Sequence, residues 1–321
     1  MVSTWDAPVQ NELRMVEEQL RESVHSEQPL LTEISNYIIT SGGKRMRPAV
    51  ALLIFKATGG MDPDKVIKVA SAFELIHSAT LIHDDINDHG EMRRGRQAAY
   101  KKYGTQKALI AGDFLFVKSF ALGGAFDEKV IGVVAEACTA LAESEILQSD
   151  YEHDQDTNID VYINIIEGKT ARPFEAGAWV GSYLADASPA VMEAMGSYGL
   201  NVGIAFQIVD DILDVTGDEV TLGKPHGIDI IDGKPTLPLI IAMKDKTHGD
   251  RIKEIFRKDK KSPAEVAEAI ALIKKTDALS ASSDMAEEYA SKALLDLEVL
   301  RPSEYKEALK ALTKAILERK S

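Results

Sequence analysis

The chain has 321 residues, and its 51 acidic against 37 basic side chains give a formal net charge of −14 at pH 7. Proteins that bind nucleic acid through its phosphates need an excess of cations, so we exclude nucleic acid as a partner. Hydrophobic residues make up 45% of the chain and charged residues 27%, which argues against disorder and coiled-coil composition. The composition therefore predicts a folded, soluble protein with a large buried core.

From the N-terminus onward, apolar residues recur at helical spacing, as in Leu13, Val16, Leu20 and Val24, whereas strand-like alternation is nearly absent. Helix starts are indicated by a capping side chain followed by proline, as at Asp62, Ser188 and Ser262. Helix ends are indicated by Gly42-Gly43, Gly59-Gly60 and Gly104. With boundaries uncertain by about two to four residues, we predict helices that include 62–88, 105–126, 127–150, 159–184 and 189–217.

No linker rich in proline, glycine or serine divides these helices. We therefore predict an all-α fold in which residues 1–321 form one large helical domain. Cys138 is the only cysteine, so no intramolecular disulfide can form, and we expect a reducing compartment in which this residue packs in the core. The first twenty residues do not resemble a signal peptide, and no apolar run approaches a membrane span of about 20 residues. We expect a cytoplasmic protein without an integral membrane segment.

A first cluster of aspartates lies in the segment LIHDDINDHGEMRRG, at Asp84, Asp85 and Asp88. At about 100° per residue, Asp84 and Asp88 lie on one helical face, one turn apart. Two like charges at this spacing repel, so the arrangement favours a bound cation, and oxygen ligands favour magnesium. A solvated acidic face is the alternative. The apolar neighbours of the cluster make the helix largely buried, which disfavours that alternative.

A second cluster lies in FQIVDDILDVTGD, at Asp210, Asp211 and Asp214, with Gln207 one turn earlier on the same face. One such motif is a weak signal. Two copies, each inside an apolar helix, are difficult to explain as surface charge, because buried carboxylates are costly without cations.

Three groups of cationic residues could offset the negative charge of these aspartates and of a phosphorylated substrate. The segment GGKRMRP supplies Lys44, Arg45 and Arg47 where a glycine-rich loop meets a helix N-terminus, which is an anion-binding arrangement. Arg93 and Arg94 follow the first cluster directly. Further cations are Lys169 of EGKTARP, where Gly168 and Pro173 should kink a helix, and Lys224 and Lys234 of LGKPHGIDIIDGKPT. This number of cations fits two phosphorylated substrates better than one.

His77 lies two turns before Asp84 and about 20° from the same helical stripe. It is therefore expected to face the same site, although a satisfied core histidine is an equally good interpretation.

Taken in order, GGKRMRP, DDIND with its RRG, KT, FQIVDDILD and GK resemble the pattern of the trans-isoprenyl diphosphate synthases, or polyprenyl synthetases, from about Gly42 to Thr236. The resemblance implies an all-α bundle with a central cavity, the isoprenoid synthase fold, in a homodimer. It also implies condensation of isopentenyl diphosphate with an allylic diphosphate by magnesium-dependent ionisation, condensation and proton elimination. The departures are Gln97, Tyr100, Arg172 and Pro173, none of which is an implied ligand.

The resemblance implies roles residue by residue. Three magnesium ions would bridge Asp84, Asp88 and Asp210 to the allylic diphosphate, with Asp85, Asp211 and Asp214 in support. Arg93, Lys169, Lys224 and Lys234 would neutralise that diphosphate, and Thr170 and Gln207 would lie beside the reacting carbons. Lys44, Arg47, His77 and Arg94 would hold isopentenyl diphosphate.

Product length follows from the residues one turn before Asp84, which are the small Ala79 and Thr80. Short-chain members of the family carry large aromatics there, so the resemblance implies a geranylgeranyl or longer product. Phe73, about 16 Å further along the helix, is a candidate floor for the growing chain.

Two alternatives remain at this point. A class I terpene cyclase also ionises an allylic diphosphate with an aspartate-rich motif, but its second motif normally includes serine or threonine and glutamate, and GGKRMRP would have no second substrate to hold. A noncatalytic partner subunit could have the same fold, although this chain retains every implied ligand. The sequence leaves open the exact product, the preferred allylic starter and the pathway.

Overall fold

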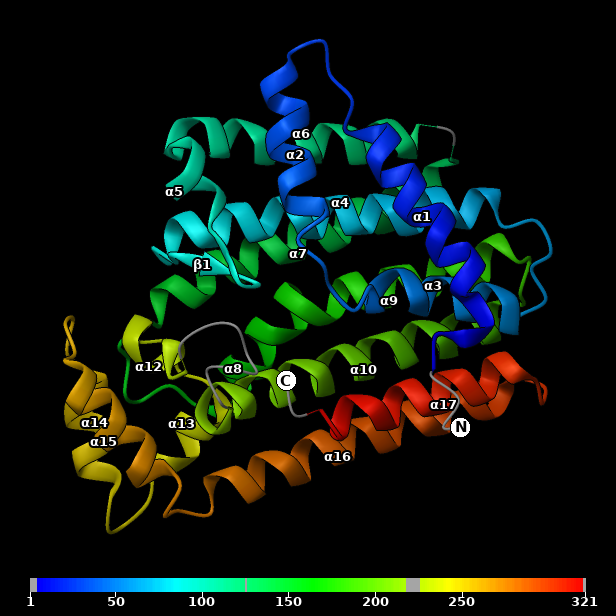
Figure 1. The fold of residues 1–321 in the computed structure, drawn as a ribbon. Coiled ribbons are helices and arrows are strands. Elements are labelled where there is room, and N and C mark those ends of the chain that lie inside the picture. Colours follow the sequence, from blue (N-terminus) through cyan, green and yellow to red (C-terminus); the bar gives the residue numbers. More distant parts are fainter. Residues whose placement is uncertain (1–4, 125, 218–225, 320–321) are drawn as a thin grey trace. The chain divides into compact units, whose positions relative to one another are not determined.

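The structure, a computed structural model, describes residues 5–124, 126–217 and 226–319. The first part of the chain is helical apart from one short hairpin (Figure 1). Its elements are η1 (Ala7–Val9), α1 (Gln10–Ser23), α2 (Pro29–Ile39), α3 (Met46–Ala57), α4 (Asp64–Asn87), β1 (Met92–Arg93), β2 (Arg96–Gln97), α5 (Ala99–Tyr103) and α6 (Thr105–Gly123).

The remaining described elements are all helical. They are α7 (Glu128–Asp150), α8 (Ile159–Ile166), η2 (Glu167–Ala171), α9 (Arg172–Leu184), α10 (Pro189–Thr216), α12 (Ile228–Asp232), α13 (Leu237–Ala242), α14 (Gly249–Phe256), α15 (Pro263–Ile273), α16 (Ala278–Asp296), η3 (Leu297–Val299) and α17 (Glu304–Leu317). The all-α prediction is confirmed. Four of the five predicted long helices are present as α4, α6, α7 and α10, and the predicted helix 159–184 is present as α8, η2 and α9.

The chain divides into two compact units. Unit 1 comprises residues 1–135, 174–199 and 297–312, and unit 2 comprises residues 136–173, 200–296 and 313–321. The single domain over 1–321, with a central cavity, stays a prediction.

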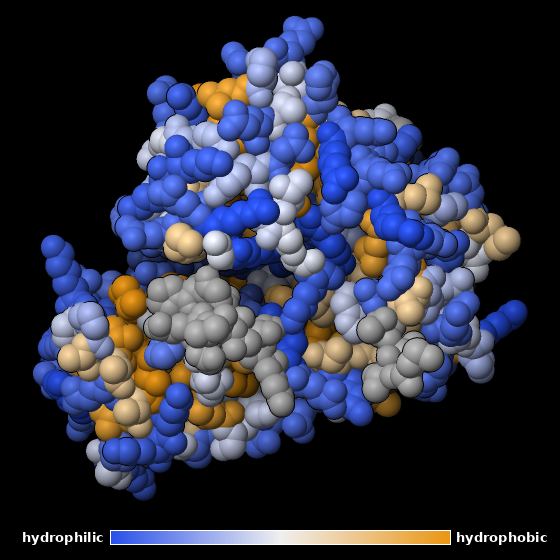
Figure 2. Space-filling model, viewed as in Figure 1, coloured by the Kyte–Doolittle hydropathy of each residue, from blue (hydrophilic) through white to orange (hydrophobic). Residues whose placement is uncertain are grey.

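In unit 1, α4 is the central helix and runs beside α6 (Figure 1). Its buried residues lie on all sides, from Val66 to Asp85, which is the pattern of a core helix. By length and composition alone α4 could also cross a membrane, but most of its apolar stretch is buried inside the protein. Helix α1 instead buries one stripe that includes Val16 and Leu20, and hydrophilic residues predominate over α1 in the face shown in Figure 2.

Helix boundaries follow the capping signals with small corrections. Helix α15 begins at Pro263 with the predicted Ser262 cap, extended to a capping box by Glu265. Helix α4 begins at Asp64 rather than at 62, because the Asp62 carboxylate accepts the Asp64 N–H at 3.2 Å. Gly104 has φ +90°, a conformation that favours glycine, and separates α5 from α6.

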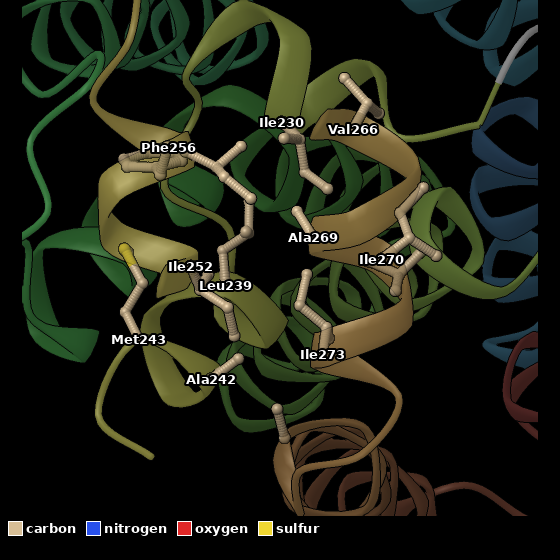
Figure 3. Packing of buried hydrophobic residues seen from close by; sticks show 13 residues of the cluster. Ile230, Leu239, Ala242, Met243, Ile252, Phe256, Val266, Ala269, Ile270 and Ile273 are labelled. Carbon is tan, nitrogen blue, oxygen red and sulfur yellow. The ribbon is translucent and has the colours of Figure 1, made fainter. Parts of the chain in front are cut away.

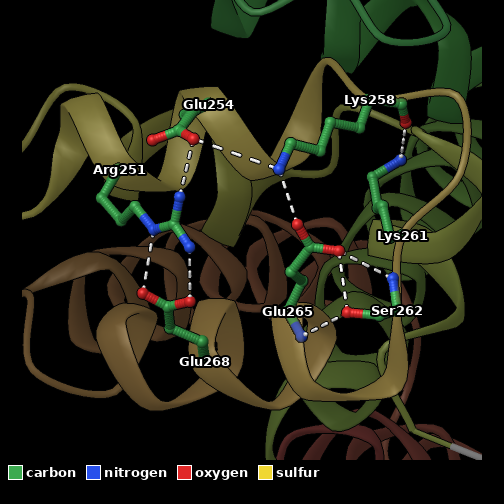
Figure 4. Close-up of polar contacts among 7 residues, drawn as sticks. All are labelled: Arg251, Glu254, Lys258, Lys261, Ser262, Glu265 and Glu268. Carbon is green, nitrogen blue, oxygen red and sulfur yellow. Dashed lines mark hydrogen bonds and ion pairs between the residues drawn. The ribbon is translucent and has the colours of Figure 1, made fainter.

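In unit 2, an apolar cluster joins α12, α13, α14 and α15 (Figure 3). Phe256 and Ile273 are among its fully buried members. Over this cluster, α14 and α15 are also joined by ion pairs (Figure 4). Arg251 forms two parallel hydrogen bonds with Glu268, at 2.9 and 2.7 Å, and Lys258 pairs with Glu265 at 2.6 Å. This layer of unit 2 is held by both packing and charge.

Candidate active site

The first aspartate cluster lies at the C-terminal end of α4, in unit 1. Asp84 and Asp88 are half-buried, whereas Asp85 is buried. The Arg93 guanidinium donates to Asp85 Oδ1 from Nε at 2.9 Å and from Nη2 at 2.5 Å. Burial raises the pKa of Asp85, and the charge of Arg93 opposes that rise. Helix carbonyls make this end of α4 negative, and its last turn has no basic residue, so the cluster lies where a cation is favoured.

A tight hairpin that the sequence analysis did not predict carries Arg93 and Arg94. Strands β1 and β2 are antiparallel, with Arg93 opposite Arg96. Arg94 and Gly95 form the two-residue turn with φ of +52° and +73°, which matches the turn type that suits a two-residue hairpin. This conformation is unfavourable for a residue other than glycine, and such residues cluster at functional sites, where the surrounding structure holds them. Arg94 donates to the Gly42 carbonyl oxygen.

The loop that contains GGKRMRP runs from the end of α2 into α3. Lys44 is exposed, and the Arg47 guanidinium lies over the Phe174 ring, 5.0 Å from its centroid. Arg45 has φ +46° and differs from its neighbours, because its side chain is buried against carboxylates. The three predicted cations therefore differ: Lys44 is exposed, Arg47 is half-buried over an aromatic ring, and Arg45 is paired with carboxylates.

His77 lies on α4 within the same cationic region. Burial lowers its pKa well below the usual value, and the positive charges of Arg47, Arg94, Arg93 and Arg45 lower it further. A histidine in this environment is neutral at neutral pH, so it can donate one N–H to an anion without adding charge.

The second aspartate cluster lies near the C-terminal end of α10, in unit 2. A chain of hydrogen bonds runs from the Thr170 hydroxyl to Gln207 Oε1 at 2.7 Å, and from Gln207 Nε2 to Asp211 Oδ1 at 2.8 Å. The Tyr162 hydroxyl donates to Asp211 Oδ2 at 2.6 Å. Burial raises the pKa of Asp211 to about 7, although both hydrogen bonds lower it. Both oxygens of Asp211 are thus engaged inside the protein.

The other two aspartates of this cluster have different surroundings. Asp214 accepts the backbone N–H groups of Ile228 at 3.3 Å and Asp229 at 3.1 Å, and so fixes the start of α12. Asp210 is the more accessible member, and it pairs with Arg319 at 3.4 Å. Arg319 also lies over the Phe206 ring, 4.6 Å from its centroid.

Lys169 lies in η2, a π-helical turn between α8 and α9 that confirms the predicted break in the helix. Its Nζ contacts Glu145 at 2.6 Å and Gln148 at 2.8 Å, both on α7. A Cβ on Gly168 would lie 1.9 Å from Ser144 Oγ and 2.7 Å from the Ala140 carbonyl oxygen. Only glycine permits this close approach of η2 to α7.

The structure thus gathers Asp84, Asp85, Asp88, Arg93, Arg94, Lys44, Arg47 and His77 in unit 1, and it gathers Lys169, Thr170, Gln207, Asp210, Asp211 and Asp214 in unit 2. Lys234 is buried in unit 2 and pairs with Asp232 at 3.3 Å. Lys224 lies outside the described residues. Among the residues that the structure describes, no three His, Cys, Asp or Glu side chains are grouped closely enough to hold a metal ion by themselves.

Three supporting residues escaped the sequence analysis. Glu74 binds Arg45, Tyr162 binds Asp211 and Arg319 binds Asp210. Tyr162 and Arg319 belong to none of the motifs. The only available signal for Glu74 was an acidic residue inside an otherwise apolar helix.

Comparison with known proteins identifies the family. The sequence profile of the polyprenyl synthetase family matches residues 28–273. The chain belongs to this family. The resemblance drawn from the aspartate motifs is therefore confirmed, and the chain is a trans-prenyltransferase with the isoprenoid synthase fold.

Relatives within the polyprenyl synthetase family align over nearly all of the chain. The all-trans-nonaprenyl-diphosphate synthase (geranyl-diphosphate specific) of Rhodobacter capsulatus is 37% identical over 98% of this chain and 96% of that protein. The short chain isoprenyl diphosphate synthase of Methanothermobacter thermautotrophicus is 37% identical over 95% of each. Their names span short and long products, so family membership does not fix the product of this chain.

The fold is shared with a crystal structure of polyprenyl synthase from Caulobacter crescentus, complexed with calcium and isoprenyl diphosphate. That structure superposes with a TM-score of 0.95 at 33% identity, covering 99% of this chain and 97% of that one. Membership of the polyprenyl synthetases favours chain elongation over the terpene cyclase alternative.

Proposed function

We propose that this prenyltransferase condenses isopentenyl diphosphate with an allylic diphosphate and releases a geranylgeranyl or longer polyprenyl diphosphate. The observation that carries the proposal is the pair of aspartate clusters, each at the negative end of a largely buried helix and each accompanied by cations. The carboxylates of each cluster repel one another, and a metal diphosphate would supply positive charge that offsets this repulsion.

The metal that we propose is magnesium, with three ions per site. The donor set fits, because Asp84, Asp88 and Asp210 offer only carboxylate oxygens and none of the three is fully buried. Magnesium is commonly held by one or two carboxylates and substrate phosphates, so a site lacking three grouped protein ligands is compatible with it. When bound, the metal supplies Lewis-acid stabilisation of the charge that develops on the departing diphosphate.

The side chains of the protein act mainly by electrostatics and position. Arg93, aligned by Asp85, and Lys169, aligned by Glu145, would stabilise the diphosphate as its C–O bond to the allylic carbon breaks. The double bond of isopentenyl diphosphate then attacks the allylic cation, and a proton leaves C2. We assign that proton to the departing diphosphate, because no residue of these motifs is an evident general base.

We assign supporting roles to the buried members of the second cluster. Asp211 is hydrogen-bonded to Tyr162 and Gln207, and Asp214 accepts hydrogen bonds from the start of α12. Both would therefore support Asp210, which would be the main metal ligand of this cluster. Thr170 and Gln207 would line the space for the reacting carbons, and Lys224 and Lys234 would complete the binding of the allylic diphosphate. Lys44, Arg47, Arg94 and neutral His77 would bind isopentenyl diphosphate.

The product is proposed to grow along α4, away from Asp84. Ala79 is fully buried on the α4 stripe that also carries Ala72 and His83, and this stripe faces α6. An apolar pocket lined by Val69 and Ala72 of α4, Phe120 of α6 and Val134 of α7 lies further along that stripe. Phe73 instead lies beside Gly177 of α9, on a different side of α4, so it would be a floor only for a chain that grew along that side. Thr80, whose hydroxyl donates to the His77 carbonyl oxygen, lies next to Ala79.

A homodimer is proposed to form through α6. Its exposed apolar side chains Leu109, Ile110, Val117 and Phe120 follow one helical stripe and lie unburied in the described structure. Val117→Glu should therefore convert the dimer to a monomer, which multi-angle light scattering would show. Lys118→Glu, a charge change next to this stripe on the same helix, should leave the dimer intact. A Val117→Glu protein that remains dimeric would exclude this interface.

The experiment that tests the proposed function is an elongation assay. The purified protein is incubated with radiolabelled isopentenyl diphosphate and, separately, with dimethylallyl, geranyl, farnesyl or geranylgeranyl diphosphate, with and without magnesium. We expect magnesium-dependent incorporation into a dephosphorylated product of at least four isoprene units. A folded protein that incorporates nothing with any starter would instead be a noncatalytic partner subunit.

A further inference from the structure

Arg45 lies in the cationic loop, but its side chain is directed into unit 1. Only 10% of the side chain is exposed, and the guanidinium contacts three other elements. Its Nε donates to Glu17 of α1 at 2.5 Å, its Nη2 donates to the Ile39 carbonyl oxygen of α2 at 2.5 Å, and its Nη1 donates to Glu74 of α4. Arg45 therefore ties the start of α3 to α1, α2 and α4.

The backbone of Arg45 indicates that this arrangement is held by its contacts. Its φ of +46° lies in the left-handed region, which is unfavourable for a residue with a Cβ. Gly42 and Gly43, with φ of +88° and +141°, turn the chain immediately before it. Glycines allow a loop many backbone conformations, and the contacts of the Arg45 guanidinium select one of them.

Glu74 supports the loop from the middle of α4. Its side chain is 4% exposed, so its carboxylate depends on buried partners. Burial and the carboxylates act oppositely on Arg45: burial lowers its pKa, and Glu74 and Glu17 more than offset this, so the guanidinium stays charged. The charge of Glu74 also acts on Arg94, whose guanidinium donates to the Gly42 carbonyl oxygen.

We propose that Arg45 and Glu74 are positioning residues that fix Lys44 of the loop and Arg47 of the first turn of α3 for isopentenyl diphosphate, and that Arg45 does not itself bind the diphosphate. If Arg45 turned toward a substrate, Glu74 would be left buried without its partner, which is strongly unfavourable. This inference rests on the proposed function, because it assigns the pair to one of the two proposed substrates.

The test is the effect of Glu74→Gln on each substrate separately. The variant keeps the shape of residue 74 and leaves Arg45 charged, but it removes the negative charge that holds the guanidinium. We expect the KM for isopentenyl diphosphate to rise about 10-fold or more, because small displacements of positioning groups have large effects. The KM for the allylic diphosphate and kcat should change less than about threefold, and Glu74→Asp, which keeps the charge, should recover most of the loss. If Arg45 were a direct ligand, releasing it from Glu74 would leave the KM unchanged or lower it.

A matched control is Glu12→Gln. Glu12 of α1 pairs with Lys56 of α3 at 3.1 Å, and this half-buried pair also joins two helices of unit 1 but does not contact the loop. The Glu12→Gln variant should have the same KM for each substrate as the unmodified protein. The inference would be overturned if Glu74→Gln kept the KM for isopentenyl diphosphate, or if Glu12→Gln raised it equally. If the unmodified protein did not elongate at all, the proposed function itself would fail. Should Glu74→Gln not fold, Glu17→Gln, which neutralises the other and more exposed carboxylate bound to Arg45, gives the same comparison with Glu12→Gln.

Discussion

Asp84→Asn is expected to lower kcat about 100- to 1000-fold without unfolding the protein. Asp84 is half-buried at the end of α4, so an amide of the same shape fits the space, but it cannot supply the negative charge that a magnesium ion requires. Because the dipole of α4 is negative at this end, losing one carboxylate should keep or raise the melting temperature. Steady-state elongation with saturating substrates measures the first effect, and thermal melting followed by circular dichroism measures the second.

The control for this substitution is Asp113→Asn. Asp113 lies on α6 with 67% of its side chain exposed and approaches His83 at 3.7 Å. The Asp113→Asn variant should retain the kcat of the unmodified protein. An Asp84→Asn protein with more than about a tenth of normal kcat would contradict the role of the first cluster.

Ala79→Phe is expected to shorten the product by at least two isoprene units. Ala79 is fully buried on the stripe of α4 that faces α6, between the aspartates and the apolar pocket lined by Val69 and Ala72. A phenyl ring there would block growth before the chain reaches that pocket. The proposed diphosphate ligands are not altered, so the early condensations should continue. Chromatography of the dephosphorylated products gives the length distribution.

Overpacking alone could also disturb the enzyme, and Ala269→Phe controls for that effect. Ala269 is buried in the apolar cluster of unit 2 (Figure 3), so the same enlargement should lower stability by about 1–3 kcal/mol. It should leave product length unchanged. A folded Ala79→Phe protein that makes the full-length product would show that the chain grows elsewhere.

The sequence predicted those parts of this structure that depend on local patterns. The helical period placed the long helices, and the Ser262 cap was correct because its capping box involves only residues 262–265. The break at Gly168 was also predicted, since glycine and proline weaken a helix regardless of its surroundings. Its reason, the close approach of Ser144, required the structure.

Contacts between distant residues were not predictable from one sequence. Arg45 was grouped with its cationic neighbours, because nothing local indicates that Glu17 and Glu74, which lie 28 and 29 residues away, bind it. Tyr162 is 49 residues from Asp211, and Arg319 is 109 residues from Asp210. The hairpin at Arg94-Gly95 was missed because its strands have two residues each, which is too short for alternation to be recognised.

We propose that both aspartate clusters take part in binding one magnesium-bound allylic diphosphate. A crystal structure of the protein with magnesium and a non-ionising farnesyl thiolodiphosphate tests it most directly. We expect magnesium and the diphosphate to be bound by Asp84, Asp88 and Asp210, with the farnesyl chain directed along α4 past Ala79. A diphosphate bound without metal, or metal that contacts only one of the two clusters, would contradict the claim.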